Sequence, residues 1–172
     1  LIKKNYILKN YKYYTILGIT SVTIFNSIVY YSLNFTQVIS GVLMISTIPV
    51  MIIFISSVLK IEKTNIFQLL GVSFSFIGVV LIITKANLEI LINLDFNRGD
   101  ITMVVGMLSW ATYSALLKKK KHELSQLTLL EVVISFGFFF LIPIYLIEYQ
   151  MGFRIILDKN FITVLTYVVL FP

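Results

Sequence analysis

The residues of this chain that could bind a ligand are polar side chains inside long uncharged runs, at spacings that place them on one helical face. The first such run extends from Tyr13 to Leu59 without a charge. Four of its polar residues follow the i, i+3, i+4, i+7 spacing of one face: Thr23, Asn26, Ser27 and Tyr30. Because polar atoms facing lipid are costly, we expect this face to point at other helices or at a wet cavity. Asn26 and Tyr30 are therefore candidate binding residues, with hydrogen bonding between helices as the alternative.

A second helical face in the same run combines small and adaptable side chains, Ser40, Met44 and Thr47. Pro49 follows it in mid-segment. Proline lacks an N–H and crowds the carbonyl of the residue four positions earlier, so we expect a kink and a free backbone acceptor at membrane depth. Kinked helices near the bilayer midplane can hold solutes, although prolines also occur in membrane helices without that role.

The segment from Gly99 to Lys121 carries an aromatic candidate site. Trp110 and Tyr113 share a face of this segment, and Trp110 falls near its middle, away from the interfacial belts where tryptophan is usual. An indole N–H at that depth needs a partner. A solute cavity and dry core packing are the two interpretations.

Glu131 is the single carboxylate inside a predicted membrane span, and Thr128 and Ser135 share its face. An acid within the membrane is a candidate for proton coupling. Its side chain could instead reach the nearby interface. Glu62 is interpreted as part of a loop ion pair. The chain has no cysteine and one histidine, and we expect no catalytic residue, no metal and no cofactor.

Composition indicates that lipid is the solvent of these elements. The chain is 58% hydrophobic and 13% charged, with a mean hydropathy of +0.93. Its net charge of +6 does not indicate nucleic acid, because the basic residues lie at the ends of apolar runs and form no continuous face. The sequence therefore predicts an all-α integral membrane protein, a polytopic helical bundle.

Charge also predicts how the chain crosses the membrane. We expect six helical crossings, at about 13–33, 36–59, 64–84, 101–117, 124–147 and 161–172, the last one truncated. With strict alternation, ten lysines lie on one side, at positions 3, 4, 9, 12, 60, 63 and 118–121. Four basic residues lie on the other, at 85, 98, 154 and 159. The positive-inside rule places the lysine-rich side in the cytosol.

The order of these features resembles a known family. The stretch from Tyr30 to Lys85, with mid-span Pro49, loop residue Glu62 and the spaced glycines Gly71 and Gly78, is similar to the second half of an EamA repeat of the drug/metabolite transporter superfamily. Gly99-Asp100, Trp110 and the SALLKKK ending resemble the first helix of the second repeat, and TYVVLFP resembles the helix two further on. Family glutamates at the loop position are often preceded by glycine, where this chain has Ile61.

The resemblance implies ten helices in two inverted five-helix repeats, with both termini cytoplasmic. Residues 1–84 would be the C-terminal part of the first repeat, 85–98 an extracytoplasmic linker and 99–172 the N-terminal part of the second repeat. The chain begins at Leu1 and stops inside an apolar run, so we expect an internal fragment of a longer protein.

The expected function is secondary transport of a small organic solute across a bacterial-type plasma (inner) membrane by alternating access. Two alternatives stay open, a structural subunit of a membrane complex and a membrane-embedded enzyme. The expected partners are the solute, the lipid bilayer and the missing helices of the same chain. No nucleic-acid partner is expected, and a homodimer is left open.

Overall fold

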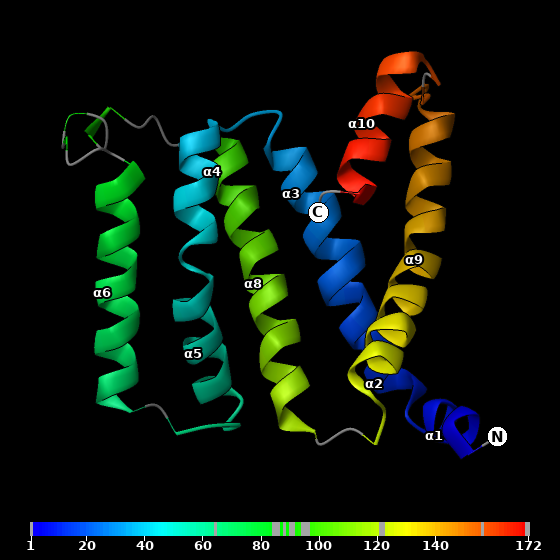
Figure 1. Ribbon diagram of the computed structural model, residues 1–172, viewed down its shortest axis with the longest axis horizontal. Helices are drawn as coiled ribbons and strands as arrows, with labels where there is room; N and C mark the ends of the chain where they lie inside the picture. The colour runs from blue at the N-terminus through cyan, green and yellow to red at the C-terminus, as the bar shows by residue number, and fades with distance from the viewer. Residues whose placement is uncertain are drawn as a thin grey trace. The chain divides into compact units, whose positions relative to one another are not determined.

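The computed structural model describes residues 2–63, 65–83, 87, 89, 92–93, 97–120, 123–155 and 157–170. Most of the expected linker 85–98 lies outside these residues. The chain divides into two compact units, Leu1–Phe140 and Leu141–Pro172, and each is described by itself. The described elements are all helical: α1 (Ile2–Lys9), α2 (Tyr11–Gly18), η1 (Ile19–Ile24), α3 (Phe25–Ser32), α4 (Val38–Ile45), α5 (Ile48–Val58), α6 (Ile66–Ile83), α8 (Arg98–Lys119), α9 (Gln126–Gln150) and α10 (Lys159–Leu170) (Figure 1).

Four helical stretches are long and apolar enough to cross a bilayer: Tyr11–Ser32, Val38–Val58, Arg98–Lys119 and Gln126–Gln150. The predicted polytopic all-α bundle is thereby confirmed. Helix α6 has 18 residues, of which Ile66–Gly78 form a fully described apolar stretch, and α10 has 12 residues. The full count of six crossings stays a prediction.

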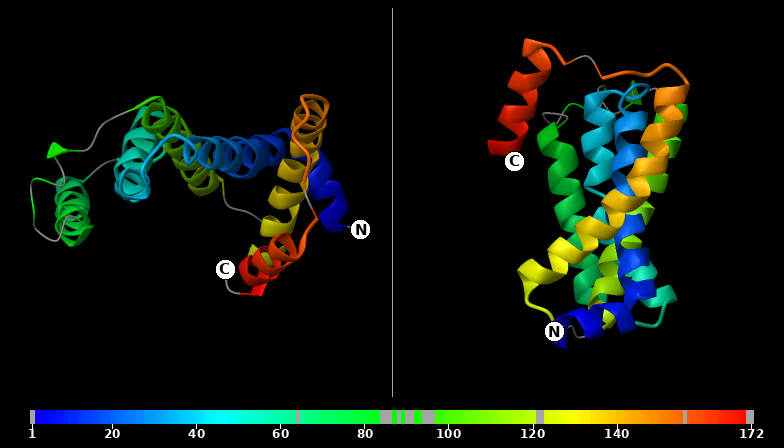
Figure 2. Two further views of the ribbon diagram at one scale, coloured as in Figure 1. Left: turned by 90° about the horizontal axis from the view of Figure 1, so that it is seen from above. Right: turned by 90° about the vertical axis from the view of Figure 1, so that its right-hand side faces the viewer.

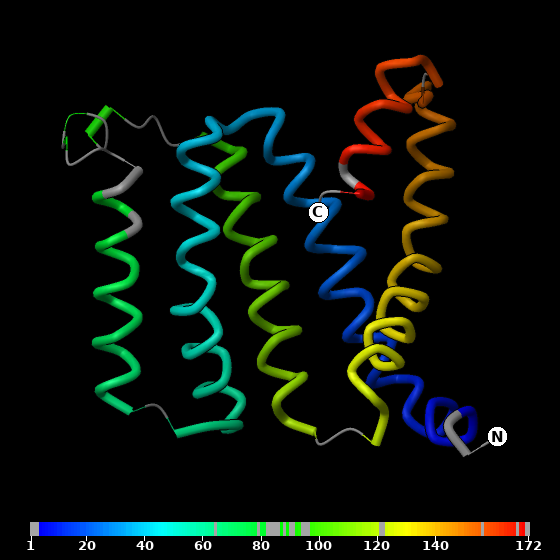
Figure 3. The backbone as a smooth tube through the Cα atoms, viewed as in Figure 1, coloured from blue at the N-terminus to red at the C-terminus, as the bar shows by residue number. Residues whose placement is uncertain are grey.

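The first of these stretches contains a π-helical segment. Figure 3 shows the backbone running from α2 through η1 into α3 along one helical path. A π turn widens the helix and changes which carbonyls are paired within it. The carbonyl of Thr20, inside η1, accepts a hydrogen bond of 2.8 Å from Ser109 Oγ of α8. The widened turn therefore joins two helices through a polar contact.

Helix α8 lies at the centre of the first unit and packs against α2, η1, α3, α4 and α5. Its buried face is made of small and flexible residues, Met103, Gly106, Met107, Ala111 and Ala115. A Cβ added at Gly106 would lie only 3.2 Å from a methyl group of Val29. Small residues at these positions let neighbouring helices approach closely, as is usual between membrane helices.

The start of α8 is fixed by a capping box. Asn97 Oδ1 accepts hydrogen bonds from the amides of Gly99 (2.6 Å) and Asp100 (3.3 Å), and Asp100 Oδ2 accepts one from the amide of Asn97 (2.7 Å). Asp100 is only 2% exposed and also accepts a hydrogen bond from the hydroxyl of Thr36. Ser32 and Thr102 share a hydroxyl contact of 2.8 Å beside it. The first turn of α8 is therefore bound to the turn between α3 and α4.

A close helix crossing in the first unit joins Gly18 of α2 to Gly137 of α9. A Cβ placed on Gly18 would lie 2.6 Å from the Gly137 amide nitrogen and 2.8 Å from the Val133 carbonyl oxygen. Thr23 Oγ1 donates a hydrogen bond of 2.9 Å to the Gly137 carbonyl. Backbone therefore lies against backbone at this point, which any side chain on either glycine would prevent.

Three lysine-bearing segments of the first unit come together at the C-terminal end of α8. Lys120 contacts the side-chain oxygen of Asn10 and lies over the rings of Tyr6 and Tyr13. Lys118 forms an ion pair with Glu62 in the loop between α5 and α6. In Figures 1 and 2 this loop and α1 lie at the same end of α8. The arrangement agrees with a single lysine-rich membrane face.

The second unit contains the end of α9 and α10. Helix α9 closes with Gly152 at φ +94°, and the amides of Gly152 and Phe153 donate to the carbonyls of Tyr149 and Glu148. Asp158 Oδ1 accepts a 2.7 Å hydrogen bond from the Phe161 amide and so caps the start of α10.

Candidate functional site

The stretch that crosses the bilayer from Val38 to Val58 is interrupted near its middle. Helix α4 ends at Ile45 and α5 starts at Ile48, with Ser46 and Thr47 between them. Pro49 lies in the first turn of α5 and offers no N–H to the carbonyl of Ile45. The hydroxyls of Ser46 and Thr47 donate 2.6 Å hydrogen bonds to the carbonyls three residues earlier. These side chains therefore satisfy part of the backbone that the break sets free.

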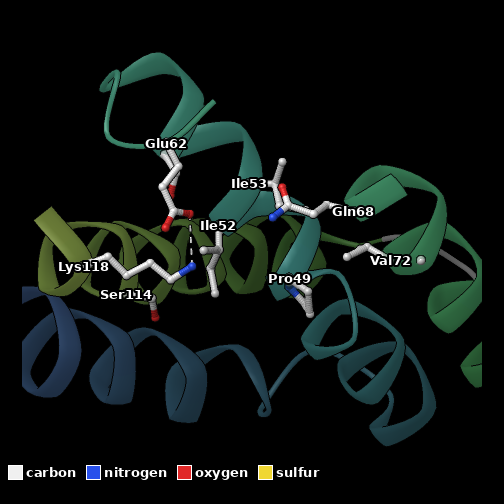
Figure 4. A pocket seen from close by; sticks show the side chains of 10 residues that line it. Pro49, Ile52, Ile53, Glu62, Gln68, Val72, Ser114 and Lys118 are labelled. Atoms are coloured by element: carbon white, nitrogen blue, oxygen red, sulfur yellow. Dashed lines mark hydrogen bonds and ion pairs between the residues drawn. The ribbon is translucent and has the colours of Figure 1, made fainter. Parts of the chain in front are cut away.

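A pocket of about 450 Å³ lies beside this break, between α5, α6 and α8 (Figure 4). The residues that line the pocket lie at successive levels along the helix axes. The level at the loop end is polar, with Ser56, Glu62, Gln68 and Lys118. The next level contains Ile52, Ile53, Gly71, Val72 and Ser114, and the innermost residue is Pro49. The pocket thus extends from the lysine-bearing end of the helices to the interrupted helix.

Glu62 and Lys118 meet at the loop end of the pocket, where Glu62 Oε2 and Lys118 Nζ are 3.2 Å apart (Figure 4). About half of each side chain is exposed. The local backbone positions Glu62. Lys60 has a left-handed φ of +53°, and the amides of Lys60 and Ile61 donate to the carbonyls of Ser57 and Ser56, which closes α5 in a Schellman-type turn.

Ser56 is the buried polar group of this pocket. Its side chain is 3% exposed, and within the described part of the chain its hydroxyl has no hydrogen-bond partner. A buried hydroxyl without a partner is destabilising, and most native proteins avoid it. The pocket wall therefore presents an unused donor and acceptor at the same polar level as the ion pair.

The candidate binding residues predicted on the first two spans do not lie in this pocket. Asn26 Nδ2 donates to the carbonyl of Val22 at 3.0 Å, within its own helical stretch, and Tyr30 is 68% exposed. Ser40 is buried and Met44 is partly buried. The hydroxyl of Thr47 donates a hydrogen bond to the backbone carbonyl of Met44. None of these five residues lines the pocket.

Trp110 and Tyr113 form an aromatic cluster with Phe25 of α3. The ring centroids of Trp110 lie 4.7 Å from Phe25 and 5.3 Å from Tyr113, with tilted rings. Such contacts are typical of packed aromatic side chains. Both Trp110 and Tyr113 keep part of their surface exposed, so the cluster leaves an accessible edge.

Glu131 is exposed on α9. The polar residues on its face use their hydroxyls elsewhere, because Ser135 donates to the Glu131 backbone carbonyl at 2.7 Å and Thr128 shares a 2.9 Å contact with Ser125.

Besides Glu62, the polar residues of the pocket are Ser56, Gln68, Ser114 and Lys118, and none of them was predicted from the sequence as a binding residue. Glu62 was assigned to a loop ion pair, and the structure shows that its partner is Lys118, 56 positions further along the chain. The resemblance to the family's loop glutamate was the one signal that drew attention to this loop.

Comparison with known proteins gives two matches. The sequence model of the EamA-like transporter family matches residues 1–84. The uncharacterized transporter YyaM of Bacillus subtilis (strain 168) is 28% identical over 115 residues. That alignment covers 67% of this chain and 38% of the relative, so the chain spans well under two thirds of the relative's length. No solved structure matches the chain.

Proposed function

Because residues 1–84 match the EamA-like transporter family, we propose that the whole protein carries a small organic solute across the plasma membrane by alternating access. The helices that are long and apolar enough to span a bilayer make this a multi-pass membrane protein. The Bacillus relative supports a bacterial plasma membrane as its location.

The observation that carries the proposal is the interrupted α4–α5 helix beside a pocket. Transporters bind solutes near the midplane, where broken helices offer backbone groups that lipid cannot satisfy. Here the break at Ser46–Thr47 lies near the centre of its span, and Pro49 is shared by the break and the pocket.

We propose the solute contacts on the polar and aromatic faces named from the sequence. They are Asn26, Tyr30, Ser40, Met44, Thr47, Trp110 and Tyr113, with Glu131 as the candidate for proton coupling. The aromatic cluster supports part of this set, since Trp110 and Tyr113 keep a partly exposed surface.

We also propose the repeat arrangement, with 1–84 in the first repeat, 85–98 as an outer linker and 99–172 in the second repeat. Single cysteines at Asn93 and Glu123, both exposed, should then be labelled from opposite sides of intact cells. Labelling of both positions from the same side would refute the proposed repeat arrangement.

Transport is tested with the full-length protein in liposomes, by uptake and counterflow of a panel of labelled amino acids, sugars, nucleotides and organic acids. At least one solute should exchange, and Trp110→Ala should lower its rate. Phe74→Ala, which truncates an aromatic residue 71% exposed on α6, is the matched control. No flux for any solute, together with co-purification of a stable partner complex, would favour the structural-subunit alternative.

A further inference from the structure

The pocket between α5, α6 and α8 has a polar end and an apolar end. Ser56 and Pro49 are separated by seven residues on α5, which is about 10 Å along a helix. The polar level lies at the loop end, where the lysines gather, and the apolar level leads to the helix break. A solute moving from the lysine-rich face toward the break would pass through the pocket in this order.

The Glu62–Lys118 ion pair lies across the outer, polar end of this path. It joins two separate elements, the α5–α6 loop and the last turn of α8. Within the described residues it is the single salt bridge, and it connects segments on either side of the expected boundary between the repeats. A half-exposed pair in this position is weak enough to break and re-form during a transport cycle.

We propose that the pocket is an entry chamber on the lysine-rich, cytosolic side and that the Glu62–Lys118 ion pair is the latch that closes it. When the two side chains separate, the Ser56 hydroxyl becomes accessible and supplies the first buried hydrogen-bonding group that an entering solute meets. This inference rests on the proposed transport function and adds the location and closing contact of one mouth of the path.

The latch is tested by the chemical accessibility of position 56. The 172 residues contain no cysteine, so Ser56→Cys can be labelled in a full-length background without other cysteines. Inside-out membrane vesicles are treated with a membrane-impermeant thiol reagent, and the rate is measured. Glu62→Gln and Lys118→Gln should each raise the rate about two- to fivefold, the range expected when one exposed ion pair is lost.

The two single variants also distinguish a latch from simple attraction of the reagent. Removing a negative and a positive charge would change the rate for a charged reagent in opposite directions, whereas opening a latch raises it in both cases. The charge reversal Glu62→Lys with Lys118→Glu should restore slow labelling. Equal rates in all backgrounds, or a reversal as fast as the single variants, would overturn the proposal.

Matched controls are available on the same elements. A cysteine in place of Ser57, which is exposed on the same helix, should label at one rate in every background. Lys119→Gln removes a neighbouring exposed charge and should leave labelling at position 56 slow. A rise at position 57, or with Lys119→Gln, would show loosening of the helix ends and contradict the latch.

The labelling experiment tests the latch, and the liposome experiment tests the transport function. Flux in liposomes with latch-independent labelling refutes the latch and leaves the transport function intact. Latch-dependent labelling without flux for any solute confirms the closing contact and refutes the proposed transport.

Discussion

Substitution of Gly18 by alanine tests whether the crossing of α2 and α9 holds the first unit together. The added Cβ would lie 2.6 Å from the Gly137 nitrogen and 2.8 Å from the Val133 carbonyl oxygen. Both are backbone atoms, so no side chain can rotate to relieve the contact. To restore the 3.4 Å of ordinary contact, the helices must separate by about 0.8 Å.

The expected loss of stability follows from that displacement. Overpacking of a close interface costs about 1–3 kcal/mol. Separation also stretches the Thr23–Gly137 hydrogen bond, and such bonds between membrane helices contribute about 0.6 kcal/mol on average. We expect Gly18→Ala to lower the free energy of unfolding by about 2 kcal/mol.

The measurement is an unfolding titration of the purified full-length protein from mild detergent into SDS. Gly71→Ala is the control, because a Cβ there meets no described atom within 4 Å. Alanine in place of a mid-helix glycine should stabilise by about 0.5–1 kcal/mol. The two substitutions should therefore shift the midpoint in opposite directions. A Gly18→Ala midpoint equal to or above that of the unsubstituted protein would refute the close crossing.

Three further substitutions test other parts of the structure. Asp100→Asn weakens the charge-assisted bonds to Asn97 and Thr36 and should cost about 1.5–3 kcal/mol in the same titration; an unchanged midpoint would contradict the buried cap. Pro49→Ala returns an amide donor to the break, so it should reduce solute flux in liposomes without lowering the SDS midpoint, and full flux would show that the break is dispensable. Glu131→Gln should abolish the pH dependence of uptake; an unaltered pH profile would eliminate Glu131 as the coupling group.

The membrane class of this protein could be predicted from its sequence because hydropathy and charge act locally. Long uncharged runs that end in lysines form few stable structures other than helices across a bilayer. The start of α8 could also be predicted, because the charge at Asp100 ends the apolar run. The capping hydrogen bonds of Asn97 could not be predicted, because they depend on the backbone geometry at the turn.

The pocket could not be predicted, because its residues come from distant positions. Glu62 has Lys60 and Lys63 beside it in sequence, yet its partner is Lys118. The end of α5 carries no glycine, and Lys60 adopts the left-handed conformation that usually indicates one. Gly71 and Gly78, which the sequence analysis took from the family pattern, meet no described atom within 4 Å, whereas Gly18 and Gly137 make the close crossing.

The two ends of α8 are held by different kinds of contact. The first turn holds a buried carboxylate, two hydroxyl contacts and the Arg98 guanidinium over the Phe35 ring, all directed at the α3–α4 turn. The last turns are joined to the α5–α6 loop by one half-exposed salt bridge, and the Leu116 carbonyl accepts a 2.7 Å hydrogen bond from the Tyr13 hydroxyl of α2. Separation of α8 from the α5–α6 loop therefore requires the loss of one exposed ion pair. Separation from α2 or from the α3–α4 turn would break hydrogen bonds that are at least partly buried.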